Sequence, residues 1–173
     1  MMILMMRTMT KNKMSVFSKI SNTAKRNNNT VTKAIITAPN TYKPGAAYSQ
    51  AILANQTLYV SGVLGMDSKY KLACGVEAQT KLLFENMKQV LKAGGASLES
   101  VIKTTILLAK MEDFPVVNKI YACYFPKNSP ARATFQVVNL PRGAAIEIEA
   151  IALSGELVIT QGLPADPCSN PCS

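Results

Sequence analysis

The sequence contains no histidine and no tryptophan, and aromatic residues make up only 6% of its 173 residues. The missing histidine excludes Ser-His and Cys-His nucleophile pairs, histidine-ligated metals and histidine acid–base catalysis. If the protein is an enzyme that moves protons, carboxylates and water are the groups that remain for this work.

Acidic residues are absent from the first 66 positions, and the first of them is Asp67. Residues 1–37 carry seven lysines or arginines and no acid, whereas residues 38–173 carry twelve basic and ten acidic side chains, a net charge of +2. The overall charge of +9 therefore belongs mostly to the N-terminal part. It says little about what the folded part binds.

Long apolar runs are also missing, since none approaches the roughly 20 residues that span a bilayer. We therefore expect no membrane-spanning helix. The four cysteines are widely spaced, and Cys168 and Cys172 lie in a proline-rich tail, so neither a disulfide framework nor a zinc site is predicted. A composition of 48% apolar and 17% charged residues indicates one folded domain.

Three segments differ in composition. Residues 1–33 are basic, rich in hydroxyl groups and free of acids, as in a mitochondrial presequence; an unstructured basic tail and a true start at Met14 are the alternatives. Residues 34–157 form the expected domain, and residues 158–173 the expected flexible tail. The protein is accordingly expected in the mitochondrial matrix, the cytoplasm or both.

Apolar periodicity predicts the elements of the domain. A short strand at 34–37 and a hairpin of 48–54 with 57–61 are followed by a loop with Gly62, Gly65 and Gly75. A helix at 76–92 stops at Gly94-Gly95, and the β-branched run 101–109 suits a buried strand. Asp113 is expected to cap a second helix that ends before Pro126. The runs 132–139 and 144–153 read as a final hairpin.

This order predicts an α+β domain with one mixed sheet and two helices on one face. The other face presents apolar side chains at alternate positions and must be covered. A second copy of the chain is the simplest cover, so we expect an oligomer.

Chemistry is expected at the final hairpin. Alternation along 145–150 places Glu147 and Glu149 on the same face, and Arg132 begins the preceding strand. A hairpin would bring these charges to one end of the sheet. The pattern alone favours a solvated surface ion pair, worth under about 1 kcal/mol, over a functional site.

Several stretches resemble the RidA/YjgF family, also known as the L-PSP endoribonuclease family. They are Pro-Ala-Arg-Ala-Thr-Phe-Gln-Val at 130–137, Leu-Pro-Arg-Gly at 140–143 and Ile-Glu-Ile-Glu-Ala at 146–150. Tyr-Ser-Gln at 48–50, Ser-Gly at 61–62 and Asp-Phe-Pro-Val-Val-Asn at 113–118 match further family positions, so the likeness covers about 120 residues.

The resemblance implies a chorismate-mutase-like fold, a homotrimer with clefts between subunits, and no cofactor or metal. It implies hydrolysis of enamines and imines such as 2-aminoacrylate, 2-iminopropanoate and 2-iminobutanoate to 2-keto acids and ammonia. The family's catalytic arginine and glutamate correspond to Arg132 and Glu147. Its substrate-binding positions correspond to Tyr48, Gly62, Asn118 and Thr134.

The implied roles agree with the chemistry of the residues. Arginine can hold a substrate carboxylate through two parallel charge-assisted hydrogen bonds, and a glutamate can position water or move protons. Tyr48 and Asn118 also fit plain structural roles, as a packing aromatic and a solvent-facing helix residue. Thr134 stands where many bacterial members have cysteine, and Ala47 and Val63 also depart from the family pattern, which bears on the substrate range.

Two other functions remain open. Some members of the family are described as endoribonucleases that inhibit translation, and the basic leader could bind RNA without specificity. Against this, the folded part has a net charge of only +2 and no recognisable RNA-binding module. The clefts could also hold small acids without turnover, as in a binding or chaperone-like protein.

Overall fold

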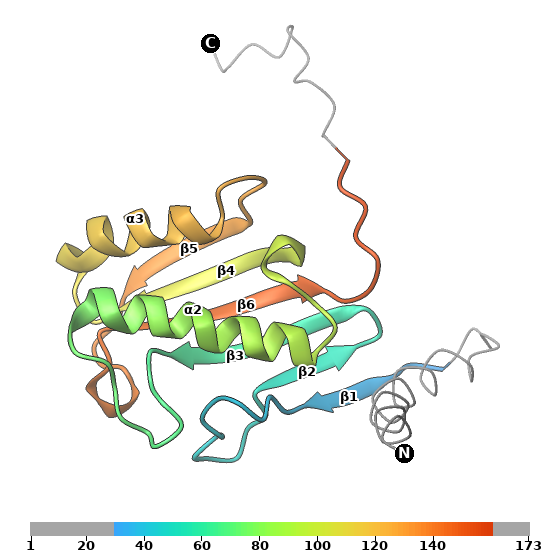
Figure 1. The fold of residues 1–173 in the computed structure, drawn as a ribbon, viewed down its shortest axis with the longest axis horizontal. Coiled ribbons are helices and arrows are strands. Elements are labelled where there is room, and N and C mark those ends of the chain that lie inside the picture. The colour runs from blue at the N-terminus through green and yellow to red at the C-terminus, as the bar shows by residue number, and fades with distance from the viewer. Residues whose placement is uncertain (1–29, 161–173) are drawn as a thin grey trace, which may run out of the picture. The chain divides into compact units, whose positions relative to one another are not determined.

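The structure is a computed structural model that describes residues 30–160 (Figure 1). Most of the expected leader, and the tail with Cys168 and Cys172, lie outside the described residues. The elements are six strands and two α-helices: β1 (Lys33–Ile36), β2 (Ala51–Ala54), β3 (Thr57–Leu64), α2 (Gly75–Ala93), β4 (Val101–Leu108), α3 (Phe114–Tyr124), β5 (Ala131–Gln136) and β6 (Ile146–Leu153). No helix in the described region is long and apolar enough to cross a membrane.

The six strands form one mixed sheet in the order β1-β2-β3-β6-β4-β5. β4 and β5 are parallel, and every other neighbouring pair is antiparallel. The predicted mixed sheet and the β2–β3 hairpin are confirmed. The predicted final hairpin is wrong: α3 carries the chain back so that β5 lies parallel to β4, and β6 then enters between β3 and β4.

Both helices lie on one face of the sheet, as predicted (Figure 1). α2 buries the expected apolar face, and Gly94 ends it by donating to the carbonyls of Val90 and Leu91. The expected cap of α3 is absent. Asp113 is in the helical region at φ −76° and ψ −14°, as the last residue of a 3-10 turn, and its side chain bonds none of the helix amides. A side-chain cap requires an extended residue there.

The core fills the space between the helices and the sheet. Leu83, Phe84 and Met87 of α2 are fully buried against Ile106 of β4 and Ile148 of β6. Burial of each such side chain stabilises the fold by about 1.5–3 kcal/mol. This packing makes the helix-covered face of the sheet rigid, and with it the positions of the side chains at its margin.

The opposite face of the sheet has no covering element among the described residues. Strand register aligns one row across it, from Ile35 through Ile52, Tyr59 and Ile151 to Lys103. Ile35 and Tyr59 are 69% and 50% exposed. Exposed apolar side chains aligned in this way indicate a contact surface. We call it the open face below.

Candidate functional site

Arg132 lies on the helix-covered side of the edge strand β5, because it pairs in register with the fully buried Thr104 of β4. Its guanidinium donates a hydrogen bond from Nη1 to Oδ1 of Asn118 on α3, at 2.8 Å. The guanidinium carbon also lies 4.8 Å from the ring centre of Tyr121 and 5.6 Å from that of Phe114. The side chain is thus held from one side by helix α3.

The guanidinium keeps donors free for a ligand. Ion pairs among the described residues join Lys81 to Glu77 and Lys88 to Glu85, and Arg132 is in neither. Thr134 follows two residues later on the same side of β5 and is half-buried. We call Arg132, Asn118 and Thr134 the arginine group. Its guanidinium is exposed, and only one of the five N–H donors makes a hydrogen bond within the described residues.

Glu147 lies on the open face, where it pairs in register with Leu64 of β3 and Leu107 of β4. It is half-buried, and burial raises the pKa of its carboxyl, with a further rise from the charge of Glu149 two residues along the same strand. A carboxyl with a raised pKa, no ion pair within 30–160 and access to solvent is suited to move protons.

A β-bulge brings the backbone of Gly62 close to the Glu147 carboxylate. The β3–β6 register shifts between Val60 and Val63, so the two residues between them are displaced from the regular pleat. A methyl group at Gly62 would stand 2.6 Å from Cδ of Glu147. Glycine is needed here because the carboxylate occupies the space that a side chain would take. The sequence reading ended the strand at Ser61 and missed this bulge, since β3 continues to Leu64.

Tyr48 stands beside Gly62 in the loop before β2. Ser61 anchors this loop by donating from Oγ to the carbonyl of Ser49 at 2.7 Å and from its amide to the carbonyl of Gln50. Tyr48 is 48% exposed and lines a small cavity together with Gly62 and Tyr42. Tyr48, Gly62 and Glu147 form a second group, the glutamate group.

Tyr42 is a buried residue that lies beside the glutamate group. Its hydroxyl oxygen accepts a hydrogen bond from the amide of Leu64 at 2.7 Å, and burial raises its pKa to about 12, with smaller contributions from Tyr48 and Glu147. Neither Tyr42 nor Tyr121 is among the site residues predicted from the sequence, although Tyr121 is expected on the apolar face of the second helix. For Tyr121 the signal was its place three residues after Asn118 on one helix face.

The two groups do not meet within one chain. Arg132 shares the helix-covered side with Thr104, whereas Glu147 shares the open face with Leu107 and, one register pair further, with Phe135. The expectation that a hairpin would join Arg132 to Glu147 and Glu149 at one end of the sheet is therefore wrong, as is the ion pair that it implied. β4 separates β5 from β6, and the pleat sends the two side chains to opposite faces.

The geometry at Gly62 makes a prediction. Gly62→Ala is expected to push the Glu147 carboxylate aside and to lower kcat about 10- to 100-fold, since a displacement of about 1 Å can cost this much. Gly45→Ala is the matched control, because a methyl group there meets nothing within 4 Å. Turnover and melting temperature are measured for both. A Gly62→Ala protein as active as wild type would contradict the role of this close contact.

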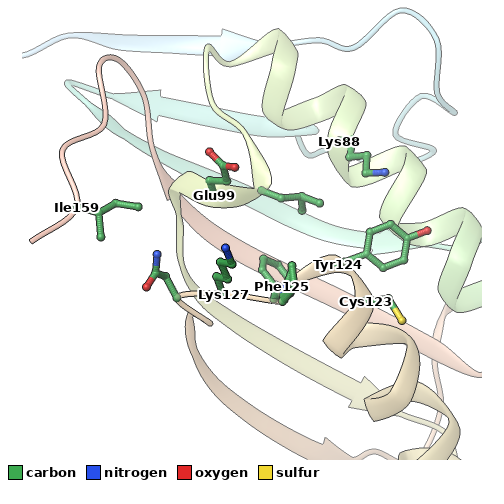
Figure 2. Close-up of a pocket in the computed structure, with 10 residues that line it drawn as sticks. Lys88, Glu99, Cys123, Tyr124, Phe125, Lys127 and Ile159 are labelled. Atoms are coloured by element: carbon green, nitrogen blue, oxygen red, sulfur yellow. The ribbon is translucent and has the colours of Figure 1, made fainter. Parts of the chain in front are cut away.

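A hollow of about 500 Å³ lies elsewhere, at the C-terminal end of α3, lined by Lys88, Glu99, Tyr124 and Lys127 among others (Figure 2). None of the six predicted site residues lines it. Of its two lysines, Lys88 donates a hydrogen bond to Glu85 and lies 4.8 Å from the ring centre of Tyr124. The predicted residues therefore concentrate in the arginine and glutamate groups and not in this hollow.

The fold and the two groups define a class: a small α+β domain with one helix-covered and one open sheet face, and a group of polar side chains on each. Residues 35–154 match the model of the family described as Endoribonuclease L-PSP. The chain belongs to this family, which confirms the RidA/YjgF resemblance.

Individual relatives agree. The 2-iminobutanoate/2-iminopropanoate deaminase of Homo sapiens is 49% identical over 118 residues, which are 66% of this chain and 86% of that protein. The crystal structure of a putative endoribonuclease L-PSP from Entamoeba histolytica has 41% identity and a TM-score of 0.68, covering 70% of this chain and 99% of that one. The structure of E. coli TdcF with bound serine has 28% identity and a TM-score of 0.67, covering 70% and 99%.

Proposed function

We propose that this protein hydrolyses reactive 2-imino acids and their enamine tautomers to 2-keto acids and ammonia. The observation that carries the proposal is the guanidinium of Arg132, held by Asn118 and without a carboxylate partner among the described residues. It stands in a chain 49% identical to a protein named for deamination of 2-iminobutanoate and 2-iminopropanoate. A relative that binds serine, itself a small amino acid with a carboxylate, fits the same substrate class.

The arginine group suits the carboxylate end of such a substrate. Arginine offers five N–H donors in a planar fork, and the bond to Asn118 uses one of them. Two parallel bonds to a carboxylate remain available, and each is charge-assisted. Thr134 is the next residue on the same side of β5, where it can contact the part of the substrate beyond the carboxylate. The group therefore fixes the orientation of the imine carbon.

The glutamate group suits the addition of water. Glu147 as a carboxylate takes a proton from water, the hydroxide oxygen bonds to the imine carbon, and the nitrogen receives a proton. The added hydroxyl group then gives up its proton and the amine nitrogen takes up a second one. The C–N bond breaks, its electrons leave with the nitrogen as ammonia, and the oxygen is left as the keto group. An enamine first accepts a proton on its terminal carbon to become the imine. General base catalysis of this kind contributes about 10²–10⁴-fold.

The complete site requires a second copy of the chain, because the two groups lie on opposite faces of one sheet. The open face supports such an assembly: it is apolar along the row from Ile35 to Ile151 and hollowed by about 400 Å³ around Tyr59, Lys103 and Glu149. A contact between unlike surfaces, the open face of one copy and the β5 edge of the next, closes into a ring. We propose the homotrimer of the family, with its chorismate-mutase-like fold, as that ring.

A coupled assay tests the function. A serine dehydratase generates 2-aminoacrylate, and release of keto acid is followed with and without the protein. We expect the protein to accelerate release. Equal rates would overturn the proposal, and cleavage of single-stranded RNA by the same preparation without acceleration would replace it with the ribonuclease alternative.

The pKa of Glu147 predicts the pH dependence of turnover. Burial raises this pKa first and the charge of Glu149 second. The active form is the carboxylate, so activity falls as the pH drops through the raised pKa. Glu149→Gln removes one cause, lowers the pKa of Glu147 and is expected to move the acid limb of the kcat profile to lower pH.

Glu99→Gln is the control for this shift, because Glu99 is an exposed acid that lines the hollow at the end of α3.

The thermal stability of Glu147→Gln gives an independent check on the raised pKa. Because the folded-state pKa of Glu147 is raised, the stability it contributes is present below its unfolded pKa and is lost as the pH rises through the folded value. Glu147→Gln should therefore melt at a higher temperature than wild type near pH 8 but not near pH 3. An unmoved acid limb in Glu149→Gln would contradict the assignment of Glu147 as the base.

A further inference from the structure

We propose that Tyr121 is a positioning residue for Arg132: its ring is a platform under the guanidinium, and Thr104 fixes the orientation of that ring. The inference rests on the proposed function, because it assigns the support of the arginine that binds the substrate carboxylate. It concerns two residues on the helix-covered side of the sheet, where the core makes positions rigid.

The ring of Tyr121 is held at its hydroxyl end. Tyr121 is buried, and its Oη lies 2.9 Å from Oγ1 of Thr104, which is fully buried. Thr104 is the residue on β4 that pairs in register with Arg132 on β5. The hydrogen bond therefore ties the end of the ring to the strand position beside the arginine that the ring supports.

The body of the ring is held by other aromatic side chains. Phe125 lies 4.6 Å from it between ring centres, and Phe84 of α2 lies 5.9 Å away, edge-on. Burial raises the pKa of Tyr121, against smaller opposing effects of the Thr104 bond and the Arg132 charge. The phenol is thus neutral at physiological pH, and its ring, 4.8 Å from the guanidinium, attracts the cation through its negative face.

Arg132 is an exposed side chain on an edge strand, and its guanidinium contacts Asn118, the ring of Tyr121 and, at the longer distance of 5.6 Å, the ring of Phe114. The ring of Tyr121 limits how closely the guanidinium can approach helix α3. Asn118 restricts rotation of the guanidinium by accepting a hydrogen bond from Nη1. Without the ring, the arginine would have to lose its rotamer freedom when the substrate binds, and this loss would weaken binding. The platform is expected to act on substrate binding and not on proton transfer, since Glu147 lies on the other face of the sheet.

The test compares three variants of the full chain. Tyr121→Leu removes the ring and is expected to raise KM about 5- to 30-fold with little change in kcat, the range of a desolvated cation–π contact. Tyr121→Phe keeps the ring and is expected within about threefold of wild type, because the face of the ring makes the contact. Tyr124→Leu is the matched control. Tyr124 also stacks on Phe84, at 4.3 Å, but its hydroxyl donates a hydrogen bond to Glu85. Its ring lies 4.8 Å from Nζ of Lys88, which is drawn beside it in Figure 2.

Binding of 2-ketobutanoate, measured by calorimetry, gives a readout independent of turnover. Its dissociation constant should rise with KM in Tyr121→Leu and stay near the wild-type value in Tyr124→Leu. Thr104→Val tests the orientation of the ring. It removes the same hydrogen bond as Tyr121→Phe, so it should weaken binding by no more than about threefold when Tyr121 is present and have no further effect in Tyr121→Phe.

The outcomes separate this inference from the proposed function. If wild type turns over imines and Tyr121→Leu has the wild-type KM, the platform is overturned and the deaminase stands. If Tyr121→Leu and Tyr124→Leu raise KM equally, the effect comes from core packing and the platform is again overturned. If wild type has no turnover but binds 2-ketobutanoate, and only Tyr121→Leu weakens that binding, the platform is supported and the deaminase proposal fails.

Discussion

Replacing Arg132 by alanine is expected to lower kcat/KM about 100-fold or more, with the larger part of the loss in KM. Losing one partner of a hydrogen-bonded charge pair costs about 2–5 kcal/mol, and each 1.4 kcal/mol is a factor of ten. In the described part of the chain no other cation shares the arginine group, so nothing replaces the lost fork.

Arg132→Lys separates charge from geometry. The lysine keeps the positive charge but has no planar fork, so one of two parallel bonds to the carboxylate is lost. A hydrogen bond to a charged group is worth roughly 1.5–3 kcal/mol, so a loss of about tenfold or more is expected. Arg132→Lys should therefore fall between Arg132→Ala and wild type.

Lys119→Ala serves as the control for these substitutions. It removes an exposed positive charge from α3, next to Asn118, and this charge makes a minor contribution to the lowered pKa of Glu77 on α2. Its kcat/KM in the coupled assay should equal that of wild type. If Arg132→Ala were as active as Lys119→Ala, the substrate carboxylate would have to bind elsewhere and the proposed site would be wrong.

Mixing two inactive variants is expected to restore activity. Arg132→Ala and Glu147→Gln each lack one group, and each should be inactive alone. In a cyclic trimer whose sites combine the arginine group of one copy with the glutamate group of the next, every mixed trimer contains one site with both native groups. Hybrids isolated through two different affinity tags should therefore have about one third of the wild-type activity.

The alternative arrangement gives a different result. If each site were completed within one chain, every site in a hybrid would lack either Arg132 or Glu147, and the hybrids would be as inactive as their parents. Trimers of either variant carrying both tags are the control for the purification. This measurement tests the assembly separately from the chemistry, because it compares inactive proteins with their own mixture.

Several elements were predictable because local patterns suffice for them. The helical spacing of Leu83, Met87 and Leu91 predicted α2, and the β-branched run predicted β4, since burial of one face or a whole segment leaves a periodic trace in the chain. The mixed sheet with both helices on one face followed from the order of the elements. The set of six candidate residues followed from the resemblance to the family. The family match confirms that resemblance, and the roles of the six residues are proposals.

Other features left no local trace. The absence of a side-chain cap at Asp113 depends on a preceding 3-10 turn, and the bulge at Gly62 depends on the pairing of β3 with β6. Support of Arg132 by Tyr121 and Thr104 joins side chains from three different elements, β4, α3 and β5. Each of these is a relation between segments, and periodicity within one segment does not report it.

The sequence by itself determined which side chains are available: without histidine, a carboxylate such as Glu147 is the group expected to transfer protons, and Arg132 is the group expected to bind an acid. Only the tertiary structure decided where these groups stand. A final hairpin would have joined them, but β6 inserts between β3 and β4, and the pleat places Arg132 and Glu147 on opposite faces. The order of strands in a sheet is set by long-range packing, which a sequence pattern does not report. The pattern could therefore indicate Arg132 and Glu147 as candidates, but it could not show that they lie on opposite faces of the sheet in one chain.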